Sequence, residues 1–386
     1  MLPRSKPTYS YKEILKVFKH TLMGSDITRE LELALANYYH VKHVVLFSKA
    51  REALFSLLRA YNDPGEVLIP AYNCIVVPEA IKLAGYQPIF VDIDLNTLNF
   101  RPDDLANKIS AKTKAILITH QFGIPAEIDL FLELCKKHKL LAIEDAAPAF
   151  GANYHDRLVG TFGDAAILSF DKTKVLSGVG GGALVTNNDE IAARVQHNIP
   201  QLLPPRSIVT DSLECLAFII ATHDRLYPLS ILLYRLIRTE NLYEIATIAS
   251  KEPDRYSRQL SKFQSGLILV QISRINQILE QKRKIAHLFL NELSSDTRFR
   301  LPSIPLASSP VWSQFPILTT DKEEIFWHMR KLGVDLSWNY KYSCPESYGI
   351  NGYPNSHVAA KSVLGLPTYP SLEVSHCKAI CEKITQ

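Results

Sequence analysis

The sequence predicts an α/β protein with a large, mostly parallel mixed sheet and a smaller α+β domain at its C-terminal end. Short apolar, β-rich runs alternate with helical patterns between residues 26 and 188, which is typical of a parallel sheet covered by helices on both faces. A length of 386 residues suits about two domains. With 47% hydrophobic and 21% charged residues, the composition is that of an ordinary globular protein.

The expected elements follow one another in a regular order. Helical spacing after an aspartate predicts a first helix over 26–40. Strands are expected at 43–47, 67–70, 87–94, 113–120, 140–147, 165–170 and 183–188, with helices at 50–62, 77–85 and 127–139. A single long helix is expected over about 257–292, then a strand within 309–320 and helices over 322–333 and near 372–384.

This order suggests a boundary between two domains near residue 256. Residues 1–256 would form an N-terminal arm and the large domain, with an apolar helical insertion over about 205–250. Residues 257–386 would form the linking helix and the small domain. Within the insertion, Leu213–Ile237 is very apolar, but His223, Asp224 and Arg225 interrupt it, so neither half can span a bilayer core of ~30 Å. Two interpretations stay open: a buried or subunit-interface hairpin, or a peripheral membrane contact.

Charge and cysteine content argue against several classes of protein. A net charge of +4 without a clustered basic run gives no reason to expect nucleic-acid binding. The cysteines lack paired CxxC spacing, so we expect no metal site. The first residues, "MLPRSKPTYSYKE", have no apolar core of a signal peptide, which favours a cytoplasmic protein.

The stretch "SFDKTKVLSGVGGGALVTNN" places Lys172 and Lys174 directly before a glycine cluster. Gly178, Gly180 and Ala183 match the spacing of a dinucleotide loop, but a strand follows them where that loop needs a helix. A phosphate-binding P-loop needs a Gly-Lys pair, which the chain lacks. Two interpretations remain: a lysine that does covalent chemistry, with glycines that give its loop room, or two ordinary loop charges.

Two other segments favour the lysine. Glu144 and Asp145 end a predicted parallel strand, at the edge where ligands bind, and one carboxylate should face that site. Its alanine and proline neighbours suit a protonated ring nitrogen better than a metal. A helix starting at about Ala50, with Arg51 next, offers free N–H groups to a phosphate, and Ser169 could add a hydroxyl. Lysine, carboxylate and phosphate seat are what pyridoxal phosphate requires.

From about residue 25 to its end, the chain resembles the DegT/DnrJ/EryC1/StrS family of pyridoxal-phosphate-dependent aminotransferases. The segments "VLIPAYNCIVVPEAIKLAGYQPIFVDIDLNTLNF" and "THQFGIPAEIDLFLELCKKHKLLAIEDAAPAFGANYHDRLVGTFGDAAILSFDKTKVLSGVGGGALVTNN" carry the resemblance. It implies a fold-type I transferase, a homodimer, and pyridoxal 5'-phosphate as cofactor. It also implies transfer of an amino group from glutamate or glutamine to a nucleotide-linked keto sugar, for a polysaccharide or a glycosylated metabolite.

The resemblance also assigns residues by position. It makes Lys174, not Lys172, the catalytic lysine that holds the cofactor as a Schiff base. The implied cofactor-binding positions, besides Lys174, are Asp145 at the ring nitrogen, Ser169, Ala50 and Arg51 at the phosphate, and Cys74 where many members stack an aromatic ring. Asn339 and Tyr340 stand where members often present His-Tyr to the sugar.

Some positions depart from the family pattern. Pro148 replaces a glutamine that is usual beside the cofactor's ring hydroxyl, and Tyr72 is a candidate to replace the ring missing at Cys74. The region "PDRYSRQLSKFQSG" lacks the asparagine of a segment that reaches the partner's site. These departures leave two alternatives: a non-catalytic binding or sensor protein, and a sugar dehydratase that uses the same cofactor. Lys174 argues against the dehydratase, because that branch of the family lacks the lysine.

Overall fold

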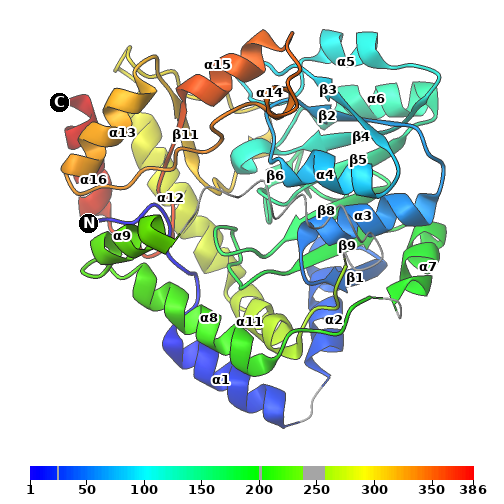
Figure 1. Cartoon of the computed structure of the whole chain (residues 1–386), viewed down its shortest axis with the longest axis horizontal. Helices are drawn as coiled ribbons and strands as arrows, with labels where there is room; N and C mark the ends of the chain where they lie inside the picture. Colours follow the sequence, from blue (N-terminus) through cyan, green and yellow to red (C-terminus); the bar gives the residue numbers. More distant parts are fainter. Residues whose placement is uncertain (24–25, 200–201, 238–256) are drawn as a thin grey trace.

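The computed structural model describes residues 1–23, 26–199, 202–237 and 257–386 (Figure 1). Its centre is a seven-stranded sheet in the order β1-β9-β8-β5-β4-β2-β3. In this sheet β9 is antiparallel to β1 and β8, and the other neighbouring pairs are parallel. The strands are β1 (His43–Phe47), β2 (Glu66–Pro70), β3 (Gln87–Val91), β4 (Thr113–Thr119), β5 (Leu141–Asp145), β8 (Ala165–Ser169) and β9 (Gly182–Thr186).

Helices cover both faces of this sheet, because alternate residues of each strand are buried on opposite sides. On β4, Ile116 and Ile118 join one core cluster, while Ala115 and Leu117 join the other. The first face is covered by α2 (Ile27–Tyr39), α5 (Pro102–Lys108), α6 (Ile128–His138), α11 (Lys262–Ile272) and the start of α12 (Ile275–Leu293). The second is covered by α3 (Ala50–Tyr61), α4 (Val76–Leu83) and α7 (Asp189–His197). The predicted α/β class with a mostly parallel mixed sheet is confirmed.

The expected single helix over 257–292 is wrong, since α11 and α12 are separate helices. Arg274 leaves the helical conformation, with φ −126° and ψ 25°. Its guanidinium donates to the Glu13 carboxylate at 3.1 Å and to the Thr8 carbonyl. The break is therefore tied to a contact with the N-terminal segment, which the local periodicity of the sequence does not encode.

A separate apolar core surrounds the C-terminal half of α12 and the antiparallel pair β11 (Phe315–Leu318) and β12 (Val363–Leu366), in the part of the chain expected to form the small domain. The N-terminal residues join it: Leu2 N donates to Gly333 O at 2.8 Å, and Asp335 N donates to Leu2 O at 2.9 Å. The proposed boundary at 256/257 falls at the end of segment 238–256, which lies outside the described residues. The other elements are α13 (Lys322–Lys331), α14 (Cys344–Ser347), α15 (Pro354–Ser362), α16 (Val374–Thr385), η1 (Gln121–Gly123), β6 (Asn153–Tyr154), β7 (Arg157–Leu158) and β10 (Ser308–Ser309).

The apolar insertion forms two helices, α8 (Ile208–Ala221) and α9 (Tyr227–Ile237), which lie with α1 (Tyr11–Leu22) at one end of the molecule (Figure 1). The inner side of α8 is buried, with Cys215 in a cluster that contains Val17 and Phe263. Residues 238–250 of the expected insertion lie outside the described part. None of the helices described here has the length and apolar character needed to cross a membrane.

Candidate functional site

A cavity of about 400 Å³ lies at the edge of the sheet where β5 and β8 end. Because β1, β2, β4, β5 and β8 run in one direction, their carboxyl ends share this edge. The volume is in the range of small-molecule sites, ~300–1,000 Å³. The cavity is lined by all the residues that the sequence singled out for cofactor and substrate: Ala50, Arg51, Cys74, Asp145, Ser169, Lys174, Asn339 and Tyr340.

Tyr72 is the exception among the residues considered in advance. It is fully buried and is not among the lining residues of the described cavity. Its ring lies against that of Tyr340, with centroids 5.0 Å apart at 76°. Tyr72 thus supports a wall of the cavity and does not replace the ring missing at Cys74.

The two neighbouring carboxylates at the end of β5 face different surroundings. Glu144 is fully buried and accepts hydrogen bonds from three backbone N–H groups between Gly160 and Gly163, at 2.6 to 2.7 Å. Asp145 lines the cavity, and its Oδ1 accepts from Ala147 N at 3.1 Å. Glu144 therefore holds a loop in place, whereas Asp145 is available to a ligand.

The electrostatics of Asp145 suit a cationic ligand. Burial raises the pKa of this carboxyl above its ordinary value, while the charge of Lys174 opposes the shift. The ionised carboxylate thus lacks a full counter-charge, which a protonated ring nitrogen in the cavity would supply. The described residues contain no group of three or more metal-ligating side chains that could hold a metal ion instead.

Two polar side chains that the sequence did not single out orient Asp145. Thr119, at the end of β4, donates to Asp145 Oδ2 at 3.5 Å. Asn73, after β2, donates in turn to Thr119 Oγ1 at 3.2 Å. Both are buried. The available signal was their position at the end of a predicted parallel strand, the same signal that pointed to Asp145.

His120 supports the other carboxylate. The side chain is fully buried, and its Nδ1 accepts from Ala126 N at 3.0 Å. The proton of the neutral ring is therefore on Nε2, which donates to Glu144 at 3.1 Å. His120 acts on the fold of the β5 edge and does not line the cavity.

Lys174 follows β8 in a short turn, in which its N–H donates to Asp171 O at 2.9 Å. The side chain is half-buried and lines the cavity. Its Nζ makes no hydrogen bond or ion pair within the described part of the chain, and its charge acts on Asp145 and Cys74. The amine is thus free to react with a carbonyl group bound beside Asp145.

The glycine cluster has a local reason in the packing of β9 against α3. A Cβ on Gly182 would lie 2.3 Å from Ala50 N and 2.5 Å from Ala50 Cα, so only glycine fits there. Gly180 and Gly181 have φ of +114° and +126°. The glycines let the backbone of β9 approach the first turn of α3 closely.

That first turn provides the candidate phosphate seat. α3 begins at Ala50 after an extended N-cap residue, Lys49, which makes no side-chain cap. Ala50, Arg51 and Ser169 all line the cavity. The partial positive charge at the start of a helix favours an anion there. The residues present therefore fit a phosphate group as well as a ring nitrogen and a carbonyl carbon.

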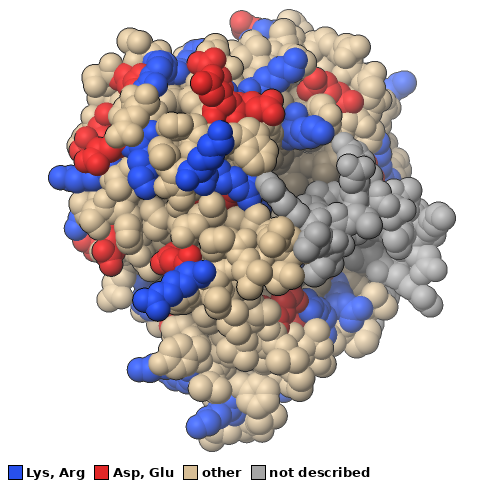
Figure 2. Space-filling model, turned by 60° about the vertical axis from the view of Figure 1, so that its left-hand side comes forward, with Lys and Arg blue, Asp and Glu red and all other residues tan. Residues whose placement is uncertain are grey.

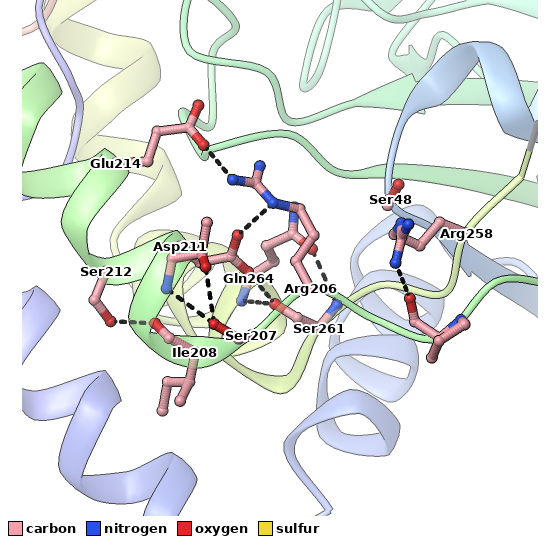
Figure 3. A network of polar contacts seen from close by, with 12 residues as sticks. Ser48, Arg206, Ser207, Ile208, Asp211, Ser212, Glu214, Arg258, Ser261 and Gln264 are labelled. Carbon is pink, nitrogen blue, oxygen red and sulfur yellow. Dashed lines mark hydrogen bonds and ion pairs between the residues drawn. The ribbon is translucent and has the colours of Figure 1, made fainter. Parts of the chain in front are cut away.

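Lys172 points away from this site and joins a polar network at the start of α8. Its Nζ lies 2.6 Å from Glu214, which also binds Arg206 at 2.6 Å. Figure 3 shows how Arg206 continues to Asp211, at 3.2 Å, and Asp211 to the Ser261 hydroxyl, at 2.6 Å. Lys172 thus anchors the turn that carries Lys174, which agrees with Lys174 as the reactive lysine.

The end of the cavity formed by the small domain is polar. Asn339, with φ +57°, and Gln314 line it, and the sequence did not single out Gln314. Asn339 Nδ2 and Gln314 Oε1 are buried and have no hydrogen-bond partner among the described residues. A buried polar atom without a partner costs about 1–3 kcal/mol. A ligand rich in hydroxyl groups would satisfy both.

Comparisons with known proteins show the family of this chain. The model of the DegT/DnrJ/EryC1/StrS aminotransferase family matches residues 9–201 and 247–385. The chain is 26% identical over 392 residues to a pleiotropic regulatory protein of Geobacillus stearothermophilus, covering 97% of this chain and 94% of that protein. It is 27% identical over 373 residues to GDP-perosamine synthase of Escherichia coli O157:H7, covering 93% and 89%.

A solved structure shares the whole fold. E. coli GDP-4-keto-6-deoxy-D-mannose-3-dehydratase, with bound hydrated pyridoxal phosphate, superposes with a TM-score of 0.79 at 16% identity, covering 100% of this chain and 99% of that chain. The fold is thus that of fold-type I pyridoxal-phosphate enzymes. This chain belongs to the DegT/DnrJ/EryC1/StrS aminotransferase family. It is a transaminase that uses pyridoxal phosphate.

Proposed function

We propose that the chain transfers an amino group from glutamate or glutamine to a nucleotide-linked keto sugar, with Lys174 as the catalytic lysine. The observation that carries the proposal is one cavity lined by Lys174, Asp145 and the start of α3. One relative is named a dTDP-3-amino-3,6-dideoxy-alpha-D-galactopyranose transaminase and another a GDP-perosamine synthase, and both names support a nucleotide-linked sugar as acceptor. The polar end at Gln314 and Asn339 supports a ligand with several hydroxyl groups.

Each group of the cavity has a distinct role in this proposal. Pyridoxal phosphate supplies an electron sink for the carbon that gains or loses the amino group. Asp145 holds the positive charge of the ring nitrogen, and the first turn of α3 with Ser169 holds the phosphate. Lys174 would hold the cofactor covalently, and its Nζ would be the group that takes a proton from the substrate carbon and returns it.

Two details favour alternatives that the same experiment can separate. Pro148 lines the cavity but has no side-chain donor, and one relative is named a regulatory protein, which together suit a binding or sensor role. A dehydratase shares the fold, although that likeness concerns the fold alone. Lys174 favours amino transfer over the dehydratase, and the reaction with an amino donor separates amino transfer from the sensor role.

The test is a spectrum of the purified protein with pyridoxal phosphate, before and after addition of glutamate or glutamine. The wild type should show the visible band of lysine-bound cofactor, and an amino donor should bleach it. Lys174→Ala should show no such band, whereas the matched control Lys172→Ala, on the same turn but outside the cavity, should keep it. Asp145→Asn should keep the band and slow the bleaching by about 10²-fold or more, because the ring nitrogen loses its counter-charge.

The outcomes distinguish the alternatives. A visible band that neither donor bleaches would contradict amino transfer and favour the sensor role. A band that persists in Lys174→Ala would assign the covalent bond to another lysine. If the donor bleaches the band, the amino form can be offered keto sugars linked to GDP, dTDP and UDP. Return of the band with one of them identifies the acceptor.

We also propose that the chain acts as a homodimer, as the family resemblance implies. Light scattering of the full chain should give about twice the mass of 43.5 kDa. A monomer that carries out amino transfer would contradict the dimer while leaving the proposed reaction intact.

A further inference from the structure

The outer side of α1, α8 and α9 exposes a group of large apolar side chains. We call these residues the apolar face. They are Tyr11, Leu15, Leu22 and Met23 on or directly after α1, Val209, Leu213 and Ile220 on α8, and Leu226, Leu229, Leu232 and Leu233 at the start of and along α9. Their exposed fractions run from 43% to 81%. In Figure 2 this end of the molecule shows broad uncharged areas with few red acidic residues. Large exposed apolar patches mark interaction sites.

The helices hold this face in a fixed shape. α8 packs against α1 and α9, and its inner residue Cys215 is fully buried. At the turn between α8 and α9, Asp224 pairs with Lys6 at 2.8 Å. Tyr227 donates to the buried carboxylate of Asp335 at 2.6 Å. The exposed leucines therefore lie on an anchored helical hairpin. The residues of α8 and α9 fall within 202–246, which the family model does not match.

The charges around the apolar face are mainly positive. Lys12, Lys16 and Lys19 are exposed, and no acidic partner for them is found in the described residues. They share one side of α1 with Leu15 and Leu22, because residues three or four apart are neighbours on a helix. The sequence of α9 has no acidic residue. The acidic residues of α1, α8 and the turn after α8 are all paired: Glu13 with Arg274, Asp211 and Glu214 with Arg206, and Asp224 with Lys6.

We propose that the apolar face binds the surface of membranes that contain anionic lipids. Leucines in a helix at an interface insert ~5–10 Å, and neighbouring lysines contact the headgroups. Each lysine near an anionic surface adds to this attraction. A second copy of the chain fits this face less well, because a two-fold interface would bring together two copies of the same positively charged surface, whose acidic residues are already paired. The proposal does not depend on the reaction in the cavity.

The experiment is flotation of the full-length protein with two kinds of vesicle, one of phosphatidylcholine alone and one with added phosphatidylglycerol. The protein should float with the anionic vesicles at low salt and much less with the neutral ones. High salt should weaken the binding, because at ~1 M the screening length falls to ~3 Å. The double variant Leu213→Glu/Leu229→Glu and the triple variant Lys12→Glu/Lys16→Glu/Lys19→Glu should each bind at least tenfold more weakly.

The control is Leu130→Glu on α6, a similarly exposed leucine (46%) outside the apolar face, which should bind like the wild type. Circular dichroism and thermal melts establish that every variant is folded. The proposal is overturned if the wild-type protein stays in the bottom fraction with both vesicles, or if Leu130→Glu loses binding as the face variants do. It is equally overturned if the double variant binds vesicles normally but changes the mass measured by light scattering, since the face would then be a subunit interface.

Discussion

At the residue scale, Glu52 in the first turn of α3 is an acid in an environment that disfavours its charge. The side chain is 4% exposed, and its oxygens accept from Ser48 Oγ at 3.0 and 3.1 Å and from Arg258 N at 3.2 Å. Burial raises the pKa of Glu52 to about 7, although both hydrogen bonds oppose the shift. The carboxyl group is therefore protonated in the folded protein at mildly acidic pH.

We expect Glu52→Gln to stabilise the protein at about pH 8 but not at about pH 4. Below the ordinary pKa of 4.5, both folded and unfolded states bind the proton, so the carboxyl costs nothing. As pH rises towards 7, the unfolded state releases this proton while the folded state keeps it. The free energy of unfolding of the wild type therefore falls by up to about 3 kcal/mol. Glutamine avoids this cost and keeps an acceptor.

The measurement is urea unfolding at both pH values, with Glu30→Gln on the exposed side of α2 as the control. Equal differences from the wild type at both pH values would show that the Glu52 carboxyl does not titrate as inferred.

At the element scale, α8 is attached to the large domain by acids in two different environments. The side chain of Asp211 has no exposed surface and binds both Arg206 and Ser261. The side chain of Glu214 is 30% exposed, and that of its partner Lys172 is 35% exposed. Ion pairs in water contribute little, whereas a buried, hydrogen-bonded carboxylate leaves its partners without acceptors when it is removed.

Asp211→Ala should therefore lower the free energy of unfolding by about 2–4 kcal/mol. Glu214→Gln, one turn further along the same helix, should lower it by about 0–1 kcal/mol. Denaturant midpoints of the two variants test this contrast. Similar losses in both would show that burial does not make Asp211 more important than Glu214 for attaching α8.

At the scale of the whole molecule, α12 connects the two cores. Its first half packs in the large domain through Ile278 and Leu279, and its second half in the small domain through Phe289 and Leu293. Between them Lys282 is buried and donates to Thr368 O at 3.0 Å and to Thr368 Oγ1 at 3.2 Å. Burial lowers the pKa of Lys282 to about 7.

We expect Lys282→Met to gain stability relative to the wild type as pH falls from about 9.5 to about 7. Over this window the unfolded lysine is protonated, since its ordinary pKa is 10.5, while the folded one is neutral. The free energy of unfolding of the wild type therefore falls by up to about 3 kcal/mol over this window. The Lys282→Met variant has no such loss, because methionine does not titrate. The loss of the two bonds to Thr368 is the same at both pH values and cancels in the difference.

Thermal or urea unfolding of both proteins at the two pH values measures this difference. The exposed Lys331→Met, at the end of α13, is the control. A pH-independent difference for Lys282→Met would show that Lys282 stays charged in the folded protein.

Most of the fold and much of the site could be predicted from local pattern. Each strand of the large sheet was predicted, because a strand buried on both faces is a short apolar run between turns. The position of Asp145 and Ser169 at strand ends placed them on one edge, and the resemblance to the family singled out Lys174 over Lys172. All three line the cavity.

Other features depend on contacts between segments far apart in the sequence. The helical spacing of apolar residues continues through Arg274 in the sequence. The helix breaks there because the side chain of Arg274 reaches Glu13. The strand pattern left open whether Glu144 or Asp145 faces the ligand, and only the family resemblance assigned Asp145. The N–H groups of the loop from Gly160 to Gly163 decided it by binding Glu144.

The sequence by itself therefore determined the sheet, its ligand-binding edge and many of the residues that lie there. Tertiary structure alone decided how Glu144 is held away from the cavity, that Gln314 joins Asn339 at its polar end, and that Lys172 anchors α8. The physical reason is that burial and strand order leave a local pattern in the chain. The partner of a polar group depends on how distant elements pack, and a local pattern carries no record of that.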